Sequence, residues 1–284
     1  MKYIVLIAAI LAAANAQAST FSGPVSTSLG GAGSAGVHIL EASHLNPATL
    51  PHLKGYYMGV LYNSASSQGS ASAPASSVSG LGLVITDASD EVLIPAAASY
   101  TRGTRLVGPT EYVETEIHVG VGFNVVKRVS AGLSVDRITR TPSNGAELID
   151  HNATLGALFA PYDNLGFSLV FKNMLETRNI EMNPTTTVGA FWMYEKLWRA
   201  YIDLSQPQKR NPSRREIVAV GVENSPIGGG LFIRTGGRWD QYEGRRFLTA
   251  GLGWDGPNLS LDYGYEKNLD YDEYRHLVDM RVQF

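Results

Sequence analysis

The chain has 284 residues and no cysteine, with 23 Lys and Arg against 26 Asp and Glu and a formal net charge of −3 at pH 7. The missing cysteines exclude disulfides, thiolate metal sites and a cysteine nucleophile, and the balanced charge gives no basic footprint for nucleic acid. Charged residues make up only 17% of the chain, against roughly 25% in typical soluble domains, while glycine reaches 30 residues. This composition argues against a cytosolic α/β enzyme.

Residues 1–18 have the pattern of a secretion signal peptide. Lys2 precedes an apolar run over residues 3–14, and Ala16-Gln17-Ala18 supplies the small residues of a cleavage site. The alternative, a membrane anchor, needs ~20 apolar residues, more than this run contains. We therefore expect cleavage after Ala18 and a mature protein outside the cytoplasm.

From residue 54 onward, apolar and polar residues alternate with a period of two, which indicates β-strands. Residues 117–125 are an example, with Ile, Val, Val, Phe and Val separated by His, Gly, Gly and Asn. The pattern predicts fourteen strands, at 54–64, 79–87, 91–103, 113–126, 129–141, 147–160, 164–174, 184–194, 197–205, 214–224, 229–238, 246–255, 258–266 and 274–284. Long connections, such as 65–78 and 104–112, are expected to alternate strictly with short turns.

An even strand number, with short turns at one end and longer loops at the other, is typical of bacterial outer-membrane barrels. A soluble sandwich also alternates, but its crossovers give no reason for two loop sizes. Strands of about 9–14 residues can cross a bilayer when tilted, and closure satisfies every backbone N–H and C=O. We predict an all-β, transmembrane antiparallel barrel over residues 54–284, with a wet lumen faced by Gly, Ser, Asp and Arg. The rings predicted to form girdles at the membrane boundary are Tyr56, Tyr62, Trp192, Tyr194, Trp198, Trp254, Tyr263 and Tyr274.

Residues 19–53 do not alternate. They contain a glycine run with Gly30, Gly31, Gly33 and Gly36, followed by Asn46-Pro47-Ala48. A phosphate-binding loop would need a preceding strand and a following Lys-Ser/Thr, and this segment has neither. Asn is a preferred N-cap and Pro suits the first helical position, so we expect a short helical turn that begins at Pro47.

The order of these features resembles the FadL/TodX family of outer-membrane transporters for long-chain fatty acids and other hydrophobic compounds, and the chain would be a short member. The features are the signal peptide, Leu-Gly-Gly-Ala-Gly-Ser-Ala-Gly, about ten residues, Asn-Pro-Ala and then a strand. The resemblance implies a 14-stranded barrel whose N-terminal segment, here 19–53, folds into the lumen as a hatch. Asn46, Pro47 and Ala48 would form the hatch motif.

The resemblance also implies an inward kink in the third strand that opens a gap in the wall toward the lipid. The candidates for this lateral gap are Pro95, Ala96, Ala97 and Ala98. Proline cannot donate to a strand ladder and is confined to edges, strand starts or breaks. A plain strand start after a turn explains Pro95 about as well.

No catalytic centre, metal site or cofactor is expected. Asp150 and His151 are adjacent on a predicted strand, so their side chains would point to opposite faces and would not form a dyad. His38, His44 and His52 are spaced by six and eight residues, which fits neither a zinc-protease helix nor a zinc finger.

Two sets of charges are candidate binding residues. The basic run Lys209, Arg210, Arg214 and Arg215 could pair with lipopolysaccharide phosphates, although a solvated loop is the simpler interpretation. Charges inside a plugged lumen should pair with one another, because an unpaired buried charge is costly. The predicted lumen charges are Asp136, Lys172, Arg199, Asp203, Arg234, Arg238, Asp262, Glu266, Asp279 and Arg281.

These features predict a passive outer-membrane channel for small hydrophobic or amphipathic compounds. The alternative is a non-transporting barrel of the same fold that serves as a structural or assembly partner for surface proteins. An apolar passage would favour the channel, and a filled lumen with paired charges would favour the alternative. Expected partners are outer-membrane lipids, a hydrophobic small molecule, and the barrel assembly machinery through the terminal Phe284, with no nucleic acid.

Overall fold

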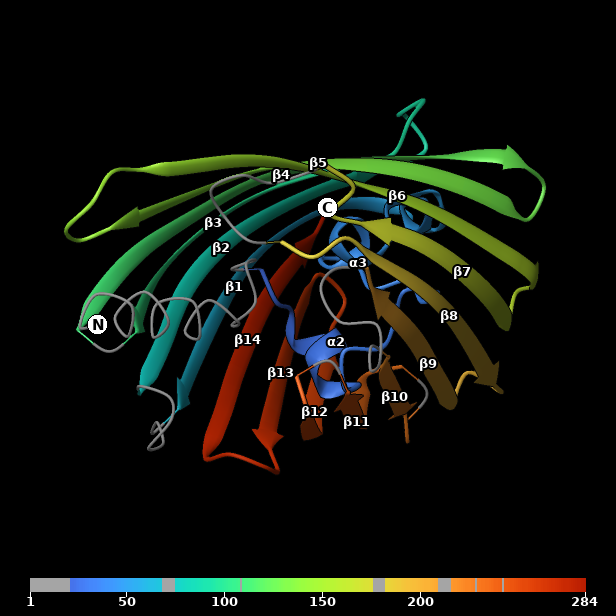
Figure 1. The fold of residues 1–284 in the computed structure, drawn as a ribbon. Helices are drawn as coiled ribbons and strands as arrows, with labels where there is room; N and C mark the ends of the chain where they lie inside the picture. Colours follow the sequence, from blue (N-terminus) through green and yellow to red (C-terminus); the bar gives the residue numbers. More distant parts are fainter. Residues whose placement is uncertain are drawn as a thin grey trace.

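The computed structural model describes residues 21–67, 75–107, 109–175, 182–208, 216–227, 229–241 and 243–284. The predicted signal peptide and the basic run at 209–215 lie outside these residues. Fourteen antiparallel strands close into one barrel, in which each strand pairs with the next and β1 pairs with β14 (Figure 1). The strands are β1 (Gly55–Ser67), β2 (Ser76–Ala88), β3 (Ala96–Val107), β4 (Thr110–Val126), β5 (Val129–Pro142), β6 (Leu148–Tyr162), β7 (Leu165–Lys172), β8 (Thr185–Tyr194), β9 (Trp198–Pro207), β10 (Ile217–Asn224), β11 (Leu231–Asp240), β12 (Arg245–Asp255), β13 (Leu259–Asn268) and β14 (Glu273–Gln283).

The predicted fold and strand number are confirmed, and the third strand carries the largest error. It was expected at 91–103 but begins at Ala96, directly after Pro95, because proline has no N–H for the ladder. The strict alternation of loop sizes is wrong at the same place. β3 ends at Val107 and β4 begins at Thr110, where a long loop was expected over 104–112. Thr104, Arg105, Thr110 and Glu111 interrupt the apolar alternation here, and hydrophobicity does not detect strands that continue beyond the apolar belt.

The outer face of the barrel is apolar and the inner face is not. On β4, Ile117 and Val119 are exposed outward, whereas His118 between them is 2% exposed and faces the lumen. The same division holds on β5, where Leu133 and Val135 are exposed and Ser134 is buried. A continuous exposed apolar belt on a closed barrel requires a lipid solvent.

The predicted aromatic girdle is partly wrong. Trp192, Tyr194, Trp198 and Trp254 are half-exposed near the end of the barrel where β8–β9 and β12–β13 turn. Tyr62, in contrast, lies in the middle of β1, where it pairs with Leu81 of β2 and Val278 of β14. The terminal Phe284 is 73% exposed, and its N–H donates to the Tyr56 carbonyl at 3.0 Å.

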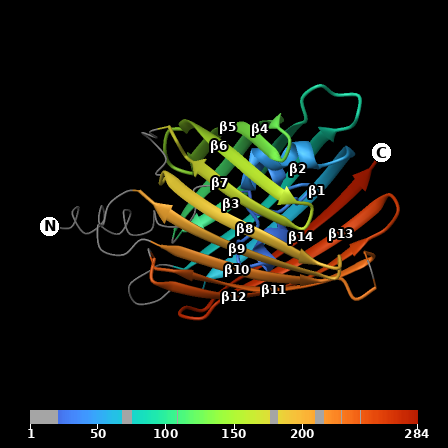
Figure 2. The same ribbon diagram turned by 90° about the vertical axis from the view of Figure 1, so that its right-hand side faces the viewer.

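The segment before β1 lies inside the ring of strands (Figures 1 and 2, blue). It forms two short helices, α2 (Pro24–Ser28) and α3 (Ala42–Leu45), and the 3-10 helix η1 (Pro47–His52). α2 packs on β11–β14, and η1 packs on β4–β6. Among the described residues, no helix combines the length and apolarity that a membrane span requires.

Candidate functional site

The Asn46-Pro47-Ala48 motif joins the lumen segment to the wall. The Asn46 amide oxygen accepts a hydrogen bond from the Ala48 N–H at 3.0 Å and so caps η1, which begins at Pro47 as expected. The Asn46 amide nitrogen donates to the Ser34 carbonyl at 2.9 Å and to the Ala157 carbonyl of β6 at 3.3 Å. One side chain, 0% exposed, therefore ties the glycine run, η1 and the wall together.

Glycines of the wall make room for this motif. A Cβ on Gly122 would lie 2.5 Å from the Pro47 carbonyl oxygen, a Cβ on Gly132 would collide with the Pro47–Ala48 peptide, and one on Gly156 would collide with Asn46. Ser130 of β5 completes the contact by donating to the Ala48 carbonyl at 2.7 Å. We call this contact between η1 and Gly122, Gly132 and Gly156 the β4–β6 seat.

A second set of glycines receives α2 and the glycine run. A Cβ on Gly264 would lie 2.6 Å from the Pro24 carbonyl oxygen, and one on Gly251 would collide with Ser28. A Cβ on Gly236 would lie 2.6 Å from the Gly30 nitrogen. We call this contact between residues 24–30 and Gly236, Gly251 and Gly264 the β11–β14 seat. The wall glycines, interpreted from the sequence as the face of a wet lumen, instead accommodate the backbone of the segment.

The glycine run itself requires left-handed backbone. Gly30 and Gly31 have φ of 74° and 88°, which side-chain-bearing residues rarely adopt. These conformations turn the chain after α2 and bring Gly33 and Ser34 to β9. There the Asp203 carboxylate accepts hydrogen bonds from the backbone N–H groups of Gly33 at 3.1 Å and Ser34 at 3.0 Å, and from the Ser34 hydroxyl at 2.9 Å.

Glu41 holds the segment together from within. Its carboxylate accepts hydrogen bonds from the N–H of Val25 at 2.8 Å and of Ser26 at 3.0 Å, at the start of α2. The group is 1% exposed, and burial raises the pKa of the Glu41 carboxyl despite these hydrogen bonds. Sequence analysis did not identify Glu41, because its partners lie fifteen and more residues earlier in the chain.

The lumen charges beside the β11–β14 seat form ion pairs. Arg234 lies between Glu223 and Asp262 and pairs with both carboxylates, and Arg199 pairs with the other oxygen of Glu223. Arg238 pairs with Glu266 at 3.1 Å. Glu223, which completes this network, was absent from the predicted set.

The remaining predicted lumen charges also lie on the inner face. Asp136 contacts His118 at 2.5 Å, and Arg281 pairs with Asp255 at 3.1 Å. Asp279 is 2% exposed and stands opposite Asp262 in the β13–β14 ladder. Lys172, at the end of β7, lines a cavity.

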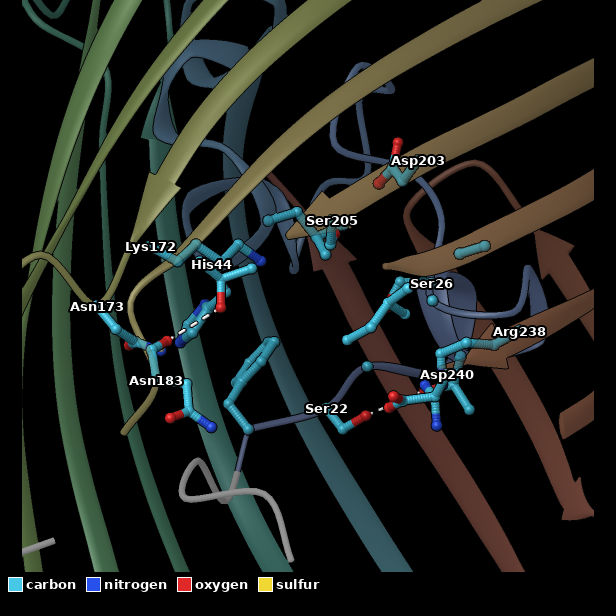
Figure 3. A pocket seen from close by; sticks show the side chains of 18 of the residues that line it. Ser22, Ser26, His44, Lys172, Asn173, Asn183, Asp203, Ser205, Arg238 and Asp240 are labelled. Atoms are coloured by element: carbon cyan, nitrogen blue, oxygen red, sulfur yellow. Dashed lines mark hydrogen bonds between the residues drawn. The ribbon is translucent and has the colours of Figure 1, made fainter. Parts of the chain in front are cut away.

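That cavity, of about 450 Å³, lies in the half of the lumen beyond α2 and α3, toward the ends of β7, β9 and β11. Figure 3 places His44 and Lys172 on one wall and Arg238 and Asp240 across from them. The lining is mixed. Its apolar members include Phe21, Leu45, Ile138, Met182, Ile217 and Phe247, and its charged members include Glu116, Asp136, Lys172, Arg238, Asp240 and Arg245.

The wall at the lateral-gap candidates is paired on both sides. Ala96 pairs with Asp87 of β2 and Val121 of β4, and both ladders continue without interruption to Val107. Ala97 is 4% exposed and packs on the lumen segment at Ala42 and Leu50, whereas Ala98 is exposed outward. Pro95 thus precedes the strand and does not kink it. β4 continues beyond this point to Val126, and Gly122 N–H donates to the Pro95 carbonyl at 3.0 Å.

These observations define a class: a 14-stranded transmembrane barrel whose lumen holds the N-terminal segment that precedes β1. No family model and no curated protein matches the sequence. Among solved structures, the chain is similar to the toluene transporter TbuX of Ralstonia pickettii, with a TM-score of 0.75 and 12% identity over 93% of this chain and 98% of that one.

Two further solved structures have the same architecture. The CymD monoaromatic hydrocarbon channel gives a TM-score of 0.72 at 12% identity over 92% of this chain and 97% of that one. A FadL homologue of Pseudomonas aeruginosa gives 0.65 at 10% identity over 93% of this chain and 98% of that one. The likeness confirms the FadL/TodX-like fold that the resemblance implied.

Proposed function

We propose that the protein is a passive outer-membrane channel that admits small hydrophobic or amphipathic molecules. The observation that carries this proposal is the cavity of about 450 Å³, which ends on the hatch and has the size of a small-molecule site. Apolar Phe21, Leu45 and Phe247 line it together with charged groups. This mixture favours a molecule with an apolar body and one polar group.

Passage beyond the cavity requires a displacement of the hatch. The hatch is held by neutral hydrogen bonds at the β4–β6 seat and by the Asp203 clamp on Gly33 and Ser34. These contacts can open thermally, so the proposal needs no cofactor and no energy coupling. The solved relatives described as a toluene transporter and a monoaromatic hydrocarbon channel support the hydrophobic class of solute.

We propose an exit beside Pro95, which requires the hydrogen bond between the Gly122 N–H and the Pro95 carbonyl to open, because the wall is paired from Ala96 onward. Lateral exit into lipid spares an apolar solute re-solvation at ~25 cal/mol per Å² of apolar surface. Ala97 faces the hatch and Ala98 faces outward. Ala97→Trp would put a large ring against Ala42 and Leu50 of the hatch and should block its movement and abolish uptake, while Ala98→Trp should leave uptake unchanged. Uptake by Ala97→Trp equal to that of the parent, with normal membrane insertion, would contradict this route.

The second candidate function is a non-transporting barrel in structural or assembly contact with surface proteins. The observation that favours it is the pairing of several lumen charges, above all the Glu223–Arg234–Asp262 set. Hatch contacts and ion pairs of this kind suit a filled lumen that serves a structural role.

Uptake distinguishes the two functions. Cells with and without the protein are given radiolabelled toluene, a long-chain fatty acid and a small aromatic carboxylate. The channel predicts faster uptake of at least one of the three with the protein, and loss of that gain in Ala97→Trp but not in Ala98→Trp. Equal uptake of all three probes by both cell types would reject the channel and favour the structural role.

A further inference from the structure

Three potential metal ligands meet at the wall of the cavity, from the hatch and from one strand. His44 belongs to α3, and Glu116 and His118 lie two residues apart on β4, so that both point into the lumen. One donor atom from each side chain lies within 4.8 Å of the other two. The side chains are 9%, 4% and 2% exposed, respectively.

Two ring nitrogens of this cluster are buried without a hydrogen-bond partner among the described residues. They are Nδ1 of His44 and Nε2 of His118. Buried polar atoms in native proteins nearly always have a partner, and an orphan calls for an explanation such as a bound ion. The other nitrogen of His44, Nε2, lies 3.1 Å from the Ser99 hydroxyl and 3.9 Å from Glu116 Oε1, so it is the His44 nitrogen that faces the carboxylate.

Asp136 fixes the state of His118. It stands opposite His118 in the β4–β5 ladder, and its Oδ1 lies 2.5 Å from His118 Nδ1. A carboxylate at this position favours the tautomer with the proton on Nδ1, and Nε2, which is buried without a partner in the described part of the chain, is then free to bind a metal ion. Metal-binding histidines in proteins are oriented in this way by a carboxylate.

We propose that His44, Glu116 and His118 bind a divalent transition-metal ion of the zinc type, with Asp136 as a positioning residue. Two imidazoles and one carboxylate are a known zinc set that leaves a fourth position open, here toward the cavity. Donor atoms in tetrahedral zinc sites are about 3.3 Å apart, given Zn–N and Zn–O distances of about 2.0–2.1 Å. The three groups would need to close by roughly 1.5 Å or less.

Metal binding requires the two histidine rings to leave their stack. The rings of His44 and His118 stack with centroids 3.7 Å apart and 18° between their planes, and Phe21 stacks on the other side of His44. The lone pairs of stacked rings lie in nearly parallel planes, so one ring must turn before both nitrogens can reach one ion. Glu116 supplies a carboxylate to the cluster, and Asp136 places a second one beside His118.

The site does not rest on transport, and binding alone tests it. The full-length folded protein in detergent is titrated with Zn²⁺ against a chromophoric chelator. We expect one equivalent bound, with at least a tenfold loss of affinity in each of His44→Asn, Glu116→Gln and His118→Asn. His52→Asn, a hatch histidine outside the cluster, is the matched control and should bind as the parent does. Unboiled gel mobility verifies that each variant is folded.

Cobalt gives a second readout that folding defects do not imitate. Co²⁺ bound in place of Zn²⁺ should show the intense visible absorption of a four-coordinate ion. Asp136→Asn should keep this spectrum but weaken binding by about 10–100-fold, the usual effect of a lost supporting carboxylate. No binding by the folded parent, or equal affinity in the parent and His118→Asn, would overturn the site. If only His44→Asn keeps the parent's affinity for Zn²⁺, the ion does not link the hatch to β4, and this part of the proposal is overturned.

Discussion

The two seats of the hatch hold it by different physics. At the β4–β6 seat, the contacts are neutral: Asn46 and Ser130 bond to backbone carbonyls, and wall glycines admit η1. The β11–β14 seat also uses glycines, but it adjoins the buried pairs of Arg234 with Glu223 and Asp262. Its α2 is capped by the buried carboxylate of Glu41.

This difference between the two seats indicates which part of the hatch can move. The neutral seat lies directly before β1, where the chain joins the wall at Gly55. Above pH 6.5 the contacts of the β4–β6 seat are uncharged, including that of His52 with the Ser130 hydroxyl, whereas ion pairs adjoin the other seat and respond to pH and salt. We therefore expect residues 21–41 to detach first while residues 46–53 stay docked as the hinge.

The largest expected effect comes from removing both seats together. Deletion of residues 22–50 takes away everything that fills the lumen between the seats, so the barrel should still insert but conduct ions many-fold better in planar bilayers. β-type circular dichroism and faster migration of the unboiled protein verify the fold. Equal conductance of the intact and shortened proteins would place the segment outside the pore.

The next effect tests the ion pairs beside the β11–β14 seat alone. Arg234→Met leaves Glu223 and Asp262 buried without their shared partner. Removing one partner of a buried ion pair typically costs about 3–5 kcal/mol, and we expect a loss of this size here. The free energy of unfolding in urea, followed by tryptophan fluorescence, should fall accordingly. Arg281→Met removes a pair whose Asp255 is 43% exposed, and it should cost about 1 kcal/mol or less. Similar losses of unfolding free energy in both variants would mean that the Glu223–Arg234–Asp262 set stabilises the protein no more than the exposed Arg281–Asp255 pair does.

His38 gives the charged side its pH dependence. Burial lowers the pKa of His38 from 6.5 to about 4, and Glu223, Arg234 and Arg199 act on it with opposing signs. The docked histidine is therefore neutral where the free one is protonated, so the contribution of His38 to docking is full above pH 6.5 and is lost as pH falls toward 4. The full effect is about 3 kcal/mol. The raised pKa of the Glu41 carboxyl acts in the opposite direction.

Protease cleavage of the hatch measures this release. Cleavage within residues 21–41 should be faster at pH 5 than at pH 7.5, and His38→Gln should reduce the difference. Burial also lowers the pKa values of His44 and His52, so part of the dependence should remain. An identical pH ratio in the parent and His38→Gln would remove His38 from the explanation.

A smaller effect is expected at the neutral seat. Gly156→Ala places a Cβ against the Asn46 amide and should loosen η1, which raises cleavage within residues 46–53 at pH 7.5. Gly80→Ala is the control, because its Cβ would meet nothing nearer than 3.5 Å. The comparison is made at one pH, because His52 lies in η1 with its Nε2 3.0 Å from the Ser130 hydroxyl and titrates at this seat. Equal cleavage within residues 46–53 in Gly156→Ala and the parent would contradict the role of this glycine.

The barrel could be predicted from the sequence because every strand carries its own signal. Lipid outside and polar groups inside impose alternation along the whole length of β4 or β5, and closure follows from the backbone. The hatch motif was predictable for a similar reason, since Asn46 caps the helix that immediately follows it. These features depend on neighbours in the chain.

The contacts of the hatch with the wall could not be predicted in this way. Ser34 and Asp203 are 169 residues apart, and nothing near either of them marks the partner. Gly132 and Gly156 fit a wet lumen as well as a docked backbone, so composition did not separate the two. The histidines were judged by their spacing along the chain, which excludes local motifs but is blind to His44 meeting His118 across the lumen.

The smallest effect concerns the cavity mouth on the charged side. Glu243 lies between β11 and β12, and its N–H donates to Asp240 at 2.9 Å. Burial raises the pKa of Glu243 from 4.5 to about 7, the charge of Arg245 opposes this rise and that of Asp240 adds to it. The mouth should therefore gain one negative charge between about pH 6 and pH 8. The small ion current through the intact protein in planar bilayers should then become more cation-selective.

Reversal potentials under a salt gradient measure this change. The shift should be modest, because Asp240, Arg245 and Glu273 already charge the same cavity, and Glu243→Gln should abolish it. Asp270→Asn is the control, since Asp270 pairs with Arg246 away from the cavity lining and should leave the shift intact. If Glu243→Gln shifts with pH as the parent does, another group titrates at the mouth. The charged groups near the β11–β14 seat would then affect the docking of the hatch, and Glu243 would not set the ion selectivity.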